Sequence, residues 1–395
     1  MTAEHAFLIL SDGSVFSGYP FGSIAPTVDE LCSGKADTLT GYGEVVFNTS
    51  MTGYHEILTD PSYAGQTVVM TYPHIGNYGA DPAWNENGPE PDSRRAVKAS
   101  GFVVHSIYEG PLPPGRVSLS EFLAEQHIPG ISGVDTRRLT LQLRDRGSCN
   151  GTLVCSDTET LTAEELKRVT AWLRQQPEMT GRKMIDAVGT VKATEKASTR
   201  NLHMALLDCG IKRNIISELG RRGVDVTVYP AGTTAGEIAE SDADALFLSN
   251  GPGDPAVLDS QIQLTRELLK KMPVFGICLG HQLISLALGA KTYKMKFGHH
   301  GANHPVRDEF TRKVCVTSQN HGFAVDRQSL PDDVSVWFTN ANDNSIEGIV
   351  HDTLPVKSVQ FHPEAAPGPH DAVWIFDEFI ATAVKWKNNR AEGTN

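Results

Sequence analysis

One stretch constrains the fold of this chain more than any other. Pro273–Ile277 is an apolar run long enough for a buried strand, and His281–Leu288 is an apolar, helix-favouring run that stops at Gly289. Between the two runs, Gly-Ile-Cys278-Leu-Gly has the glycine–x–nucleophile–x–glycine form of a sharp strand-to-helix turn. The stretch therefore predicts an α/β sheet with Cys278 exposed at the start of a helix.

The setting of Cys278 favours a reactive thiol. Unpaired amides and the positive end of the helix dipole stabilise a thiolate at that position. The amide of Leu279 is placed to donate a hydrogen bond to an oxyanion. The alternative is a small apolar cysteine buried in an ordinary turn. The two flanking glycines favour the nucleophile, because they leave room for the neighbouring strand and helix.

Bulk composition narrows the class of protein. The 395 residues suffice for two or three domains, and the net charge of −12 argues against nucleic acid or an anionic membrane as the main partner. The six cysteines include no C-x-x-C pair, which is typical of reduced thiols. The N-terminus lacks the basic and apolar regions of a signal peptide, and no apolar stretch approaches a membrane span. We expect a cytoplasmic protein.

The second half alternates short apolar strands with helices from residue 201 onward. This pattern predicts a parallel sheet with helices on both faces, whose ligands bind at the carboxyl ends of the strands. The loop Asn250-Gly-Pro-Gly-Asp-Pro and Cys278 both follow such strands. Gly253 could therefore supply a second amide to the same oxyanion as Leu279. After Gly289 the pattern becomes antiparallel, with strands expected at 313–318, 323–326, 335–339, 346–351 and 356–361 and a closing helix at 371–385.

The last of these strands runs into His362-Pro-Glu364. Residues two apart in an extended chain face the same way, so Glu364 can bind one ring nitrogen of His362 and leave the other for a thiol. Cys278, His362 and Glu364 are then a nucleophile, a base and an orienting carboxylate. His299, His300 and His304 also lie close together in sequence, but they match no familiar metal-ligand spacing, and we predict no metal site.

The first half, residues 1–186, mixes short strands with helices. Ser118 and Glu121 have the spacing of a helix capping box. Residues 83–94 are rich in Pro, Asn, Glu and Gly and are predicted to form an exposed loop. No complete active site is visible in this half, and Ser50, which follows a predicted strand, has the character of a turn residue.

Two further segments separate or end these halves. Residues 187–200 lose apolar periodicity and gain small and charged residues, which predicts a linker. The second domain then covers residues 201–388, and residues 389–395 form a tail.

Taken together, the motifs resemble those of the triad (class I) glutamine amidotransferases. The resemblance rests on Gly-Ile-Cys278-Leu-Gly-His-Gln, Gln-Phe-His362-Pro-Glu364 and Asn-Gly-Pro-Gly-Asp-Pro. Segments 297–306 and 318–323, and segments 46–54, 71–77 and 133–139 of the first half, resemble the small, glutaminase chain of carbamoyl-phosphate synthase. Other amidotransferases of this class lack that first half. Ala302 stands where the family has glycine, and the 83–94 loop is unfamiliar.

The resemblance implies a fold and a set of residue roles. The fold is α/β, with an N-terminal α+β domain and a C-terminal doubly wound, mainly parallel sheet. Cys278 would attack the side-chain amide of glutamine, His362 would relay the proton, and Glu364 would orient His362. The oxyanion and the ends of the glutamine would be held by Ser50, Gly251, Gly253, Leu279, Gln282, Asn320, Gly322 and Phe323.

The resemblance also implies a partner. In this family ammonia passes through a tunnel into a large chain, which uses ATP, Mg²⁺ and bicarbonate to make carbamoyl phosphate for arginine and pyrimidines. This chain would need no cofactor of its own, and its first half would dock the large chain in a heterodimer or a higher oligomer. Two alternatives are an amidotransferase serving another synthetase and a non-catalytic interaction subunit. The first half argues against the former, and the intact Cys-His-Glu set argues against the latter.

Overall fold

The computed structural model of the chain describes residues 4–34, 40–89, 96–196 and 202–392. The chain divides into two compact units. The first contains residues 1–85, 92–182 and 296–300, and the second contains residues 86–91, 183–295 and 301–395. Two short segments thus belong to a different unit from their neighbours in sequence, a division that no local sequence pattern marks.

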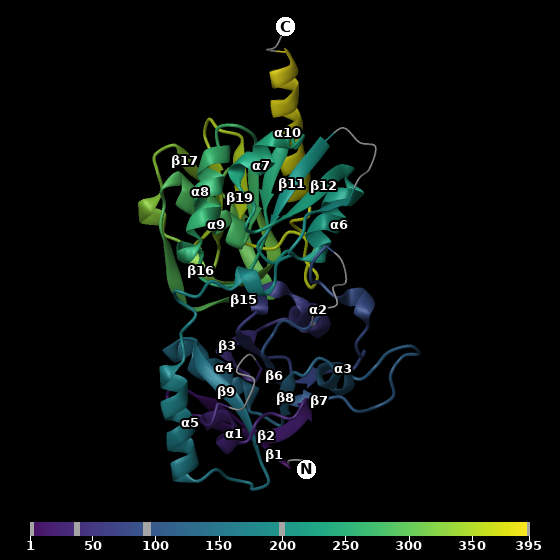
Figure 1. The fold of residues 1–395 in the computed structure, drawn as a ribbon, viewed down its shortest axis with the longest axis vertical. Coiled ribbons are helices and arrows are strands. Elements are labelled where there is room, and N and C mark those ends of the chain that lie inside the picture. The colour runs from purple at the N-terminus through teal and green to yellow at the C-terminus, as the bar shows by residue number, and fades with distance from the viewer. Residues whose placement is uncertain (1–3, 35–39, 90–95, 197–201, 393–395) are drawn as a thin grey trace. The chain divides into compact units, whose positions relative to one another are not determined.

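The first unit is built on a closed barrel in the order β1-β2-β8-β6-β4-β3-β9. Its strands are β1 (His5–Leu10), β2 (Val15–Gly22), β3 (Tyr42–Asn48), β4 (Gln66–Met70), β6 (Gly101–Val103), β8 (Pro129–Ser132) and β9 (Cys149–Ser156). A separate pair joins β5 (His74–Ile75) to β7 (Ser106–Ile107). The helices are α1 (Val28–Cys32), α2 (Tyr54–Thr59), α3 (Leu119–Glu125), α4 (Thr136–Arg146) and α5 (Ala163–Gln175). Figure 1 shows these elements in purple to blue-green.

The capping box predicted at the start of α3 is confirmed. The Ser118 hydroxyl accepts from the amide of Glu121 at 3.1 Å, and the Glu121 carboxylate accepts from the amide of Ser118 at 2.9 Å. Helix α5 begins with the same device at Thr162 and Glu165. These reciprocal bonds satisfy amides that the first helical turn leaves without partners.

The second unit contains a ten-stranded sheet in the order β10-β12-β11-β13-β14-β19-β18-β17-β15-β16. Its strands are β10 (Thr194–Lys196), β11 (Leu202–Asp208), β12 (Val224–Pro230), β13 (Ala245–Leu248), β14 (Val274–Ile277), β15 (Thr292–Asp308), β16 (Val314–Val325), β17 (Val334–Asn340), β18 (Ile346–His351) and β19 (Val356–Val359). The run from β12 through β19 is parallel, and β18 and β17 continue it in antiparallel fashion. This parallel centre with antiparallel outer strands confirms the predicted α/β architecture.

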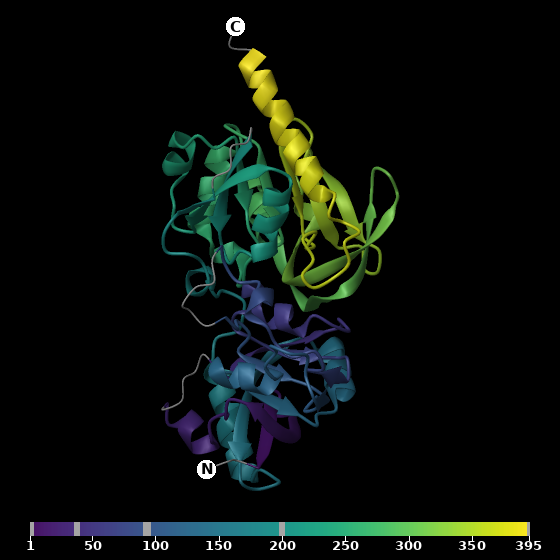
Figure 2. The ribbon, with the colours of Figure 1, turned by 90° about the vertical axis from the view of Figure 1, so that its right-hand side faces the viewer.

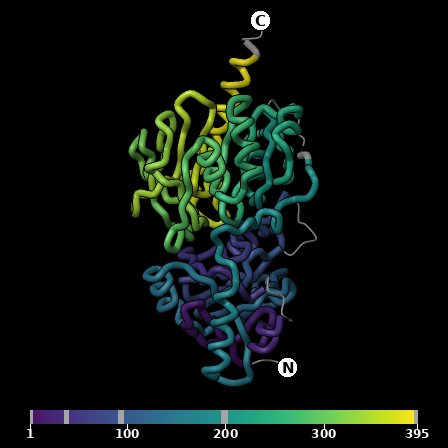
Figure 3. The backbone as a smooth tube through the Cα atoms, turned by 60° about the vertical axis from the view of Figure 1, so that its left-hand side comes forward, coloured from purple at the N-terminus to yellow at the C-terminus, as the bar shows by residue number. Residues whose placement is uncertain are grey.

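Helices cover both faces of this sheet. Helices α7 (Ala235–Glu240), α8 (Asp259–Leu268) and α9 (Leu279–Leu288) pack in one apolar core, and α6 (Arg213–Arg221) and α10 (Ile375–Glu392) pack in the other. Figure 2 shows α10 in yellow running across the sheet, and Figure 3 follows the backbone from the teal strands to that helix. The parallel strands β11, β13, β14 and β19 end at one edge, which positions the loops of the site.

Several segments differ from the sequence-based expectation. The strands expected at 313–318 and 323–326 are one continuous strand, β16. The closing helix begins at Ile375 and reaches Glu392, so residues 389–392 of the predicted tail are helical. In the predicted linker, 194–196 form β10, which pairs with β12, while 197–200 lie outside the described residues.

The 83–94 loop is the clearest correction. Glu86 and Asn87 are each only 5% exposed, so this part is not an exposed loop, and residues 90–94 lie outside the described part. The Glu86 carbonyl accepts from the amide of Arg213 at 2.8 Å, and the amide of Gly88 donates to Ile211 at 3.1 Å. Polar composition predicted exposure, but these backbone bonds to a distant loop bury the segment.

Candidate active site

Cys278 lies at the tip of a sharp turn between β14 and α9. Its backbone has φ 54° and ψ −105°, a conformation that a non-glycine residue adopts only when its surroundings impose it. A Cβ at Gly276 would lie 2.6 Å from the backbone carbon of Gly280, and one at Gly280 would overlap the carbonyl oxygen of Leu248. Both glycines are therefore required for the close approach of strand and helix. This geometry is the predicted elbow.

The Cys278 side chain is nearly enclosed, with 2% of the residue exposed. Its amide donates to Val359 of the neighbouring strand at 2.9 Å, and its thiol donates to the carbonyl of Asn320 at 3.4 Å. Sulfur at the first residue before a helix is exposed to the positive end of the helix dipole. The sulfur is therefore both enclosed by protein and placed at the amino end of α9.

His362 and Glu364 follow β19 and reach the same edge of the sheet. The Nδ1 atom of His362 lies 2.6 Å from Oε1 of Glu364, and both residues are buried. The amide of His362 donates to Ser318 at 2.9 Å, which fixes the backbone of the turn. Among the described residues, none forms a regular hydrogen bond with Nε2 of His362. That atom is the one left available for a thiol or a substrate.

Lys212 is a buried cation bound to the same carboxylate. Its ammonium lies 3.1 Å from Oε1 of Glu364 and also donates to the carbonyl of Ala365. Its side chain is 2% exposed. The backbone amide of Lys212 donates to Oδ1 of Asn250 at 3.0 Å, which ties this loop to the one that follows β13. Lys212 thus supplies the positive charge that a buried carboxylate needs.

The charges of this group stabilise one another. Burial opposes ionisation of Glu364, but the Lys212 ammonium and the His362 ring outweigh it and lower the pKa of Glu364 to about 2. Burial also opposes protonation of His362, but the Glu364 carboxylate and the Cys278 sulfur outweigh it and raise the pKa of His362 to about 10. A carboxylate that stays ionised therefore stabilises the protonated, imidazolium form of His362.

A second histidine near the elbow has a different character. His281 is fully buried in α9, and its Nδ1 atom lies 2.9 Å from the Ser358 hydroxyl. Burial lowers the pKa of His281 to about 3, so its ring is neutral over the ordinary pH range. Burial is the only influence on that pKa, and none of the carboxylates in the described residues raises it, so His281 is a poor candidate for the base.

The predicted oxyanion and substrate residues lie in loops around the elbow. Leu279 begins α9, and a Cβ at Gly251 would lie 2.9 Å from a Leu279 methyl group, so the loop after β13 passes close to the elbow. Gly253 has φ 95° and forms an isolated backbone bridge with Lys183. Gly251 therefore lies against the elbow, while the observed pairing of Gly253 is with Lys183.

The remaining predicted glutamine contacts come from three elements. The Gln282 amide group donates to the Phe323 carbonyl at 2.8 Å and to Oε1 of Gln360 at 3.0 Å. Asn320 contacts the Cys278 sulfur through its carbonyl, and Gly322 lies between Asn320 and Phe323 on β16. Ser50 is buried in the loop after β3, within the first unit, and its amide donates to Asn48 at 2.8 Å.

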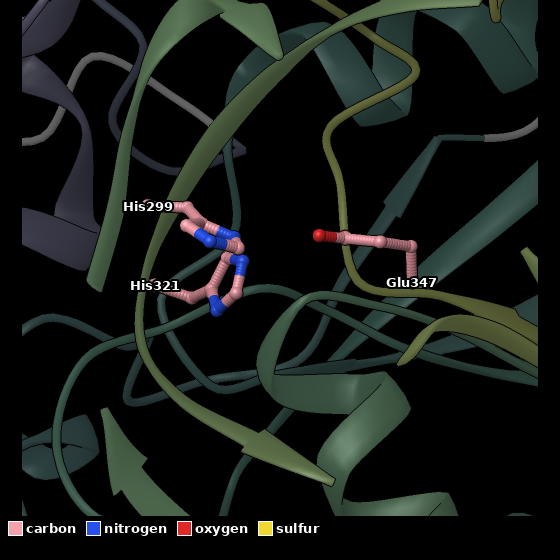
Figure 4. A group of neighbouring side chains, drawn as sticks. All are labelled: His299, His321 and Glu347. Atoms are coloured by element: carbon pink, nitrogen blue, oxygen red, sulfur yellow. The ribbon is translucent and has the colours of Figure 1, made fainter. Parts of the chain in front are cut away.

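Two polar side chains of the second unit, His321 and Glu347, are buried near the predicted glutamine contacts of β16. Figure 4 shows His321 of β16 and Glu347 of β18, drawn together with His299 of β15; a ring nitrogen of His321 lies within 4.8 Å of a Glu347 oxygen. The His321 Nδ1 atom lies 2.8 Å from the Phe323 carbonyl, and Nε2 lies 2.6 Å from Oε1 of Gln319. Because protein atoms engage both ring nitrogens, His321 would have to give up a hydrogen bond to bind a metal. The prediction of no metal site stays a prediction.

Sequence reasoning missed Lys212 and Asn214. The Asn214 side chain donates to the carbonyl of Glu364, so both residues hold the segment that carries the carboxylate. Their stretch, Gly-Ile-Lys212-Arg-Asn214, joins an apolar strand to the start of α6, which places it at the ligand-binding edge of a parallel sheet. That position was the available signal, but a lysine in a loop is usually exposed.

Each half of the chain matches a known protein family. The family described as "Glutamine amidotransferase class-I" matches residues 205–382, and "Carbamoyl-phosphate synthase small chain, CPSase domain" matches residues 8–153. The carbamoyl phosphate synthase small chain of Akkermansia muciniphila is 47% identical over 390 residues, which cover 95% of this chain and 96% of that one. The corresponding small chains of Methanopyrus kandleri (44% identical, covering 95% and 98%) and Chlorobaculum tepidum (45% identical, covering 97% and 99%) match as fully. The chain therefore belongs to the carbamoyl phosphate synthase small chain family, with a class I glutamine amidotransferase domain in its second half.

Proposed function

We propose that Cys278, His362 and Glu364 perform the glutamine hydrolysis that a small chain contributes to carbamoyl phosphate synthase. The observation that carries the proposal is the 2.6 Å bond between Glu364 and Nδ1 of His362, beside a cysteine held in a strained elbow. A carboxylate on one ring nitrogen fixes the tautomer and directs the other nitrogen to proton transfer.

In the first half-reaction, the Cys278 thiolate attacks the carboxamide carbon of glutamine. The carbonyl oxygen becomes an oxyanion, which the amides of Leu279 and Gly253 would stabilise; such a donor is worth about 3 kcal/mol in the barrier. Protonated His362 then gives its Nε2 proton to the departing nitrogen. The carbon–nitrogen bond breaks, ammonia leaves, and a thioester to Cys278 remains.

In the second half-reaction, neutral His362 takes a proton from water as the water oxygen attacks the thioester carbon. The carbon–sulfur bond breaks, glutamate forms, and the Cys278 thiolate and imidazolium are restored. Glu364 stays ionised throughout and stabilises the imidazolium. Its low pKa, maintained by Lys212 against burial, suits that role.

We further propose that the ends of the glutamine bind to Ser50, Gly251, Gln282, Asn320, Gly322 and Phe323. Support comes from the position of β16 and α9, because Asn320 contacts the sulfur and Gln282 binds the Phe323 carbonyl. Gly253 forms a backbone bridge with Lys183 in the loop after β13. Its proposed hydrogen bond to the oxyanion would form in the substrate complex, since catalytic hydrogen bonds commonly tighten only there.

The proposal extends to partner and compartment. Ammonia would pass to a carbamoyl phosphate synthase large chain that uses ATP, Mg²⁺ and bicarbonate, so this chain would need no cofactor. The first half, residues 1–186, would dock that chain in a heterodimer or a higher oligomer, in the cytoplasm, for arginine and pyrimidine synthesis. Among the helices that the structure describes, none is both long enough and apolar enough to cross a bilayer.

The test uses the small chain copurified with its large chain. Cys278→Ser should abolish glutamate release and glutamine-dependent carbamoyl phosphate synthesis, because a serine hydroxyl remains protonated where a thiol ionises. Synthesis from added ammonium chloride should continue, since that nitrogen source bypasses the proposed site. The ammonia-dependent rate therefore serves as the control for folding and assembly.

Two results would overturn the proposal. Full glutaminase activity in Cys278→Ser would mean that another residue is the nucleophile. Absence of a covalent adduct between Cys278 and a glutamine-like chloroketone would favour a non-catalytic subunit. An amidotransferase serving a different synthetase is excluded by membership in the small chain family.

A further inference from the structure

The segment 320–323 of β16 borders the proposed glutamine site at two points. The Asn320 carbonyl accepts from the Cys278 thiol at 3.4 Å, and the Phe323 carbonyl accepts from the Gln282 amide at 2.8 Å. One end of the segment therefore lies at the reacting sulfur, and the other lies beside the first turns of α9. A substrate bound through Cys278 can extend along this strand.

A lysine from the neighbouring strand lies over this segment. Lys294 of β15 places its ammonium 4.9 Å from the centre of the Phe323 ring. A Cβ built on Gly322 would lie 2.7 Å from the same ammonium. The missing side chain of Gly322 thus provides the space that the cation occupies, and the aromatic face of Phe323 attracts it there. Lys294 is partly buried, so its charge is screened less than that of a surface lysine.

The spacing along β16 matches the length of glutamine. From Asn320 to Gly322 is two residues, which span roughly 7 Å of strand. The amide carbon and the α-carboxylate carbon of an extended glutamine lie roughly 5 Å apart. A glutamine whose amide is at the Cys278 sulfur and whose chain follows β16 therefore brings its carboxylate to the level of Gly322, where the ammonium lies.

We propose that Lys294 binds the α-carboxylate of glutamine and makes the site selective for amides that carry this carboxylate. The inference rests on the proposed function, because it takes Cys278 as the point of attack. Amides of the 320–323 strand would orient the carboxylate, while Lys294 would supply the charge. A charge-assisted hydrogen bond of this kind is among the stronger polar contacts in proteins.

The experiment compares two substrates in the complex with the large chain. Glutamine is set against 4-aminobutanamide, which keeps the amide and the amine but lacks the α-carboxylate. In Lys294→Met, kcat/KM for glutamine should fall about 10- to 100-fold, mainly through KM. For 4-aminobutanamide, followed in single-turnover reactions at high enzyme concentration, kcat/KM should change less than twofold. Lys294→Arg should retain most of the preference for glutamine.

Two further variants serve as a control and as an independent test of the Lys294 ammonium. Lys313→Met removes an exposed lysine near the start of β16 and should leave both substrates unaffected. Gly322→Ala keeps the Lys294 residue but puts a methyl group 2.7 Å from its ammonium, which must then move away. The variant should therefore cause the same loss selective for glutamine. If Lys294→Met fails to assemble, Gly322→Ala answers the same question.

The outcomes separate this inference from the proposed function. An equal loss for both substrates would show that Lys294 only supports the fold of the hairpin, and no loss for either would show that it does not bind the carboxylate. Either result overturns the inference while Cys278-dependent hydrolysis continues. If the complex that carries Cys278→Ser hydrolyses glutamine at the unmodified rate, the proposed function itself fails.

Discussion

Replacing Lys212 by methionine tests the electrostatic design of the site most directly. Methionine has a similar length but no charge, so the substitution leaves Glu364 buried without the ammonium 3.1 Å from its Oε1 atom. Lys212 is the largest of the influences that lower the pKa of Glu364 from 4.5 to about 2. Such a shift corresponds to about 3 kcal/mol, and removing one partner of a buried ion pair costs about 3–5 kcal/mol.

The shifted pKa values of Glu364 and His362 determine how the stability of the folded chain depends on pH. The folded-state pKa of Glu364 is lowered, so its contribution to stability is present above pH 4.5 and is lost as pH falls toward 2. The folded-state pKa of His362 is raised, so its contribution is present below pH 6.5 and is lost as pH rises toward 10. The contribution of this pair to the free energy of unfolding is therefore largest between about pH 4.5 and 6.5.

In Lys212→Met, the pKa of Glu364 rises, and a protonated carboxyl no longer supports the imidazolium of His362. We expect the urea-derived free energy of unfolding at pH 7 to fall by about 3 kcal/mol. The acidic limb of the kcat/KM profile for glutamine should move to higher pH, because Glu364 loses its charge sooner.

The matched control is Lys183→Met. Lys183 pairs with Asp186 at 2.9 Å, but the two side chains are 46% and 65% exposed, so the cost should stay below about 1 kcal/mol. The measurements are urea unfolding of both variants and the pH dependence of kcat/KM for glutamine from pH 5 to 10. If Lys212→Met unfolds at the same urea concentration as the unmodified chain and keeps its pH profile, the electrostatic account of the site is wrong.

Two further substitutions test the elbow and the orienting carboxylate. Gly280→Ala places a methyl group against the carbonyl of Leu248. In thermal unfolding it should lower the free energy of unfolding by about 1–3 kcal/mol, and glutaminase activity should be lost. The control is Gly220→Ala on α6, whose added methyl group meets open space, so the same assay should show a neutral or stabilising effect. Glu364→Gln should lower kcat for glutamine by a hundredfold or more while the ammonia-dependent rate persists, because an amide cannot stabilise the imidazolium of His362. A kcat within tenfold of the unmodified value would mean that Glu364 does not act on the base.

The local sequence was sufficient to predict the elbow and the pairing of His362 with Glu364. Two glycines around Cys278 leave few structures other than a tight strand-to-helix turn, and a spacing of two residues in extended chain puts His362 and Glu364 on one side. The position of the site at one edge of the sheet could also be predicted, because alternating strands and helices bring the carboxyl ends of parallel strands together.

The parts that could not be predicted depend on contacts between distant segments. Lys212 is buried in an ion pair with Glu364, which lies far along the chain. The strand β16 is continuous through the polar residues 318–322, which resemble a loop in sequence, and residues 318–321 are buried in the fold. Hydrophobic periodicity and turn-forming residues are local patterns, so they do not predict contacts between segments that are far apart in sequence.

The segment 86–88 shows how this long-range dependence reaches the proposed site. The Glu86 carboxylate accepts from the amide of Asn214 at 3.2 Å, and the Asn214 side chain donates to the carbonyl of Glu364. Asn87 forms a backbone bridge with Lys212, whose ammonium binds the Glu364 carboxylate. The loop that holds the orienting carboxylate is therefore itself held by residues that precede it by more than a hundred positions. The family match at residues 205–382 does not include residues 86–88, although residues 86–91 belong to the same compact unit as Glu364. The structural support of Glu364 therefore extends beyond the segment that matches the class I amidotransferase family.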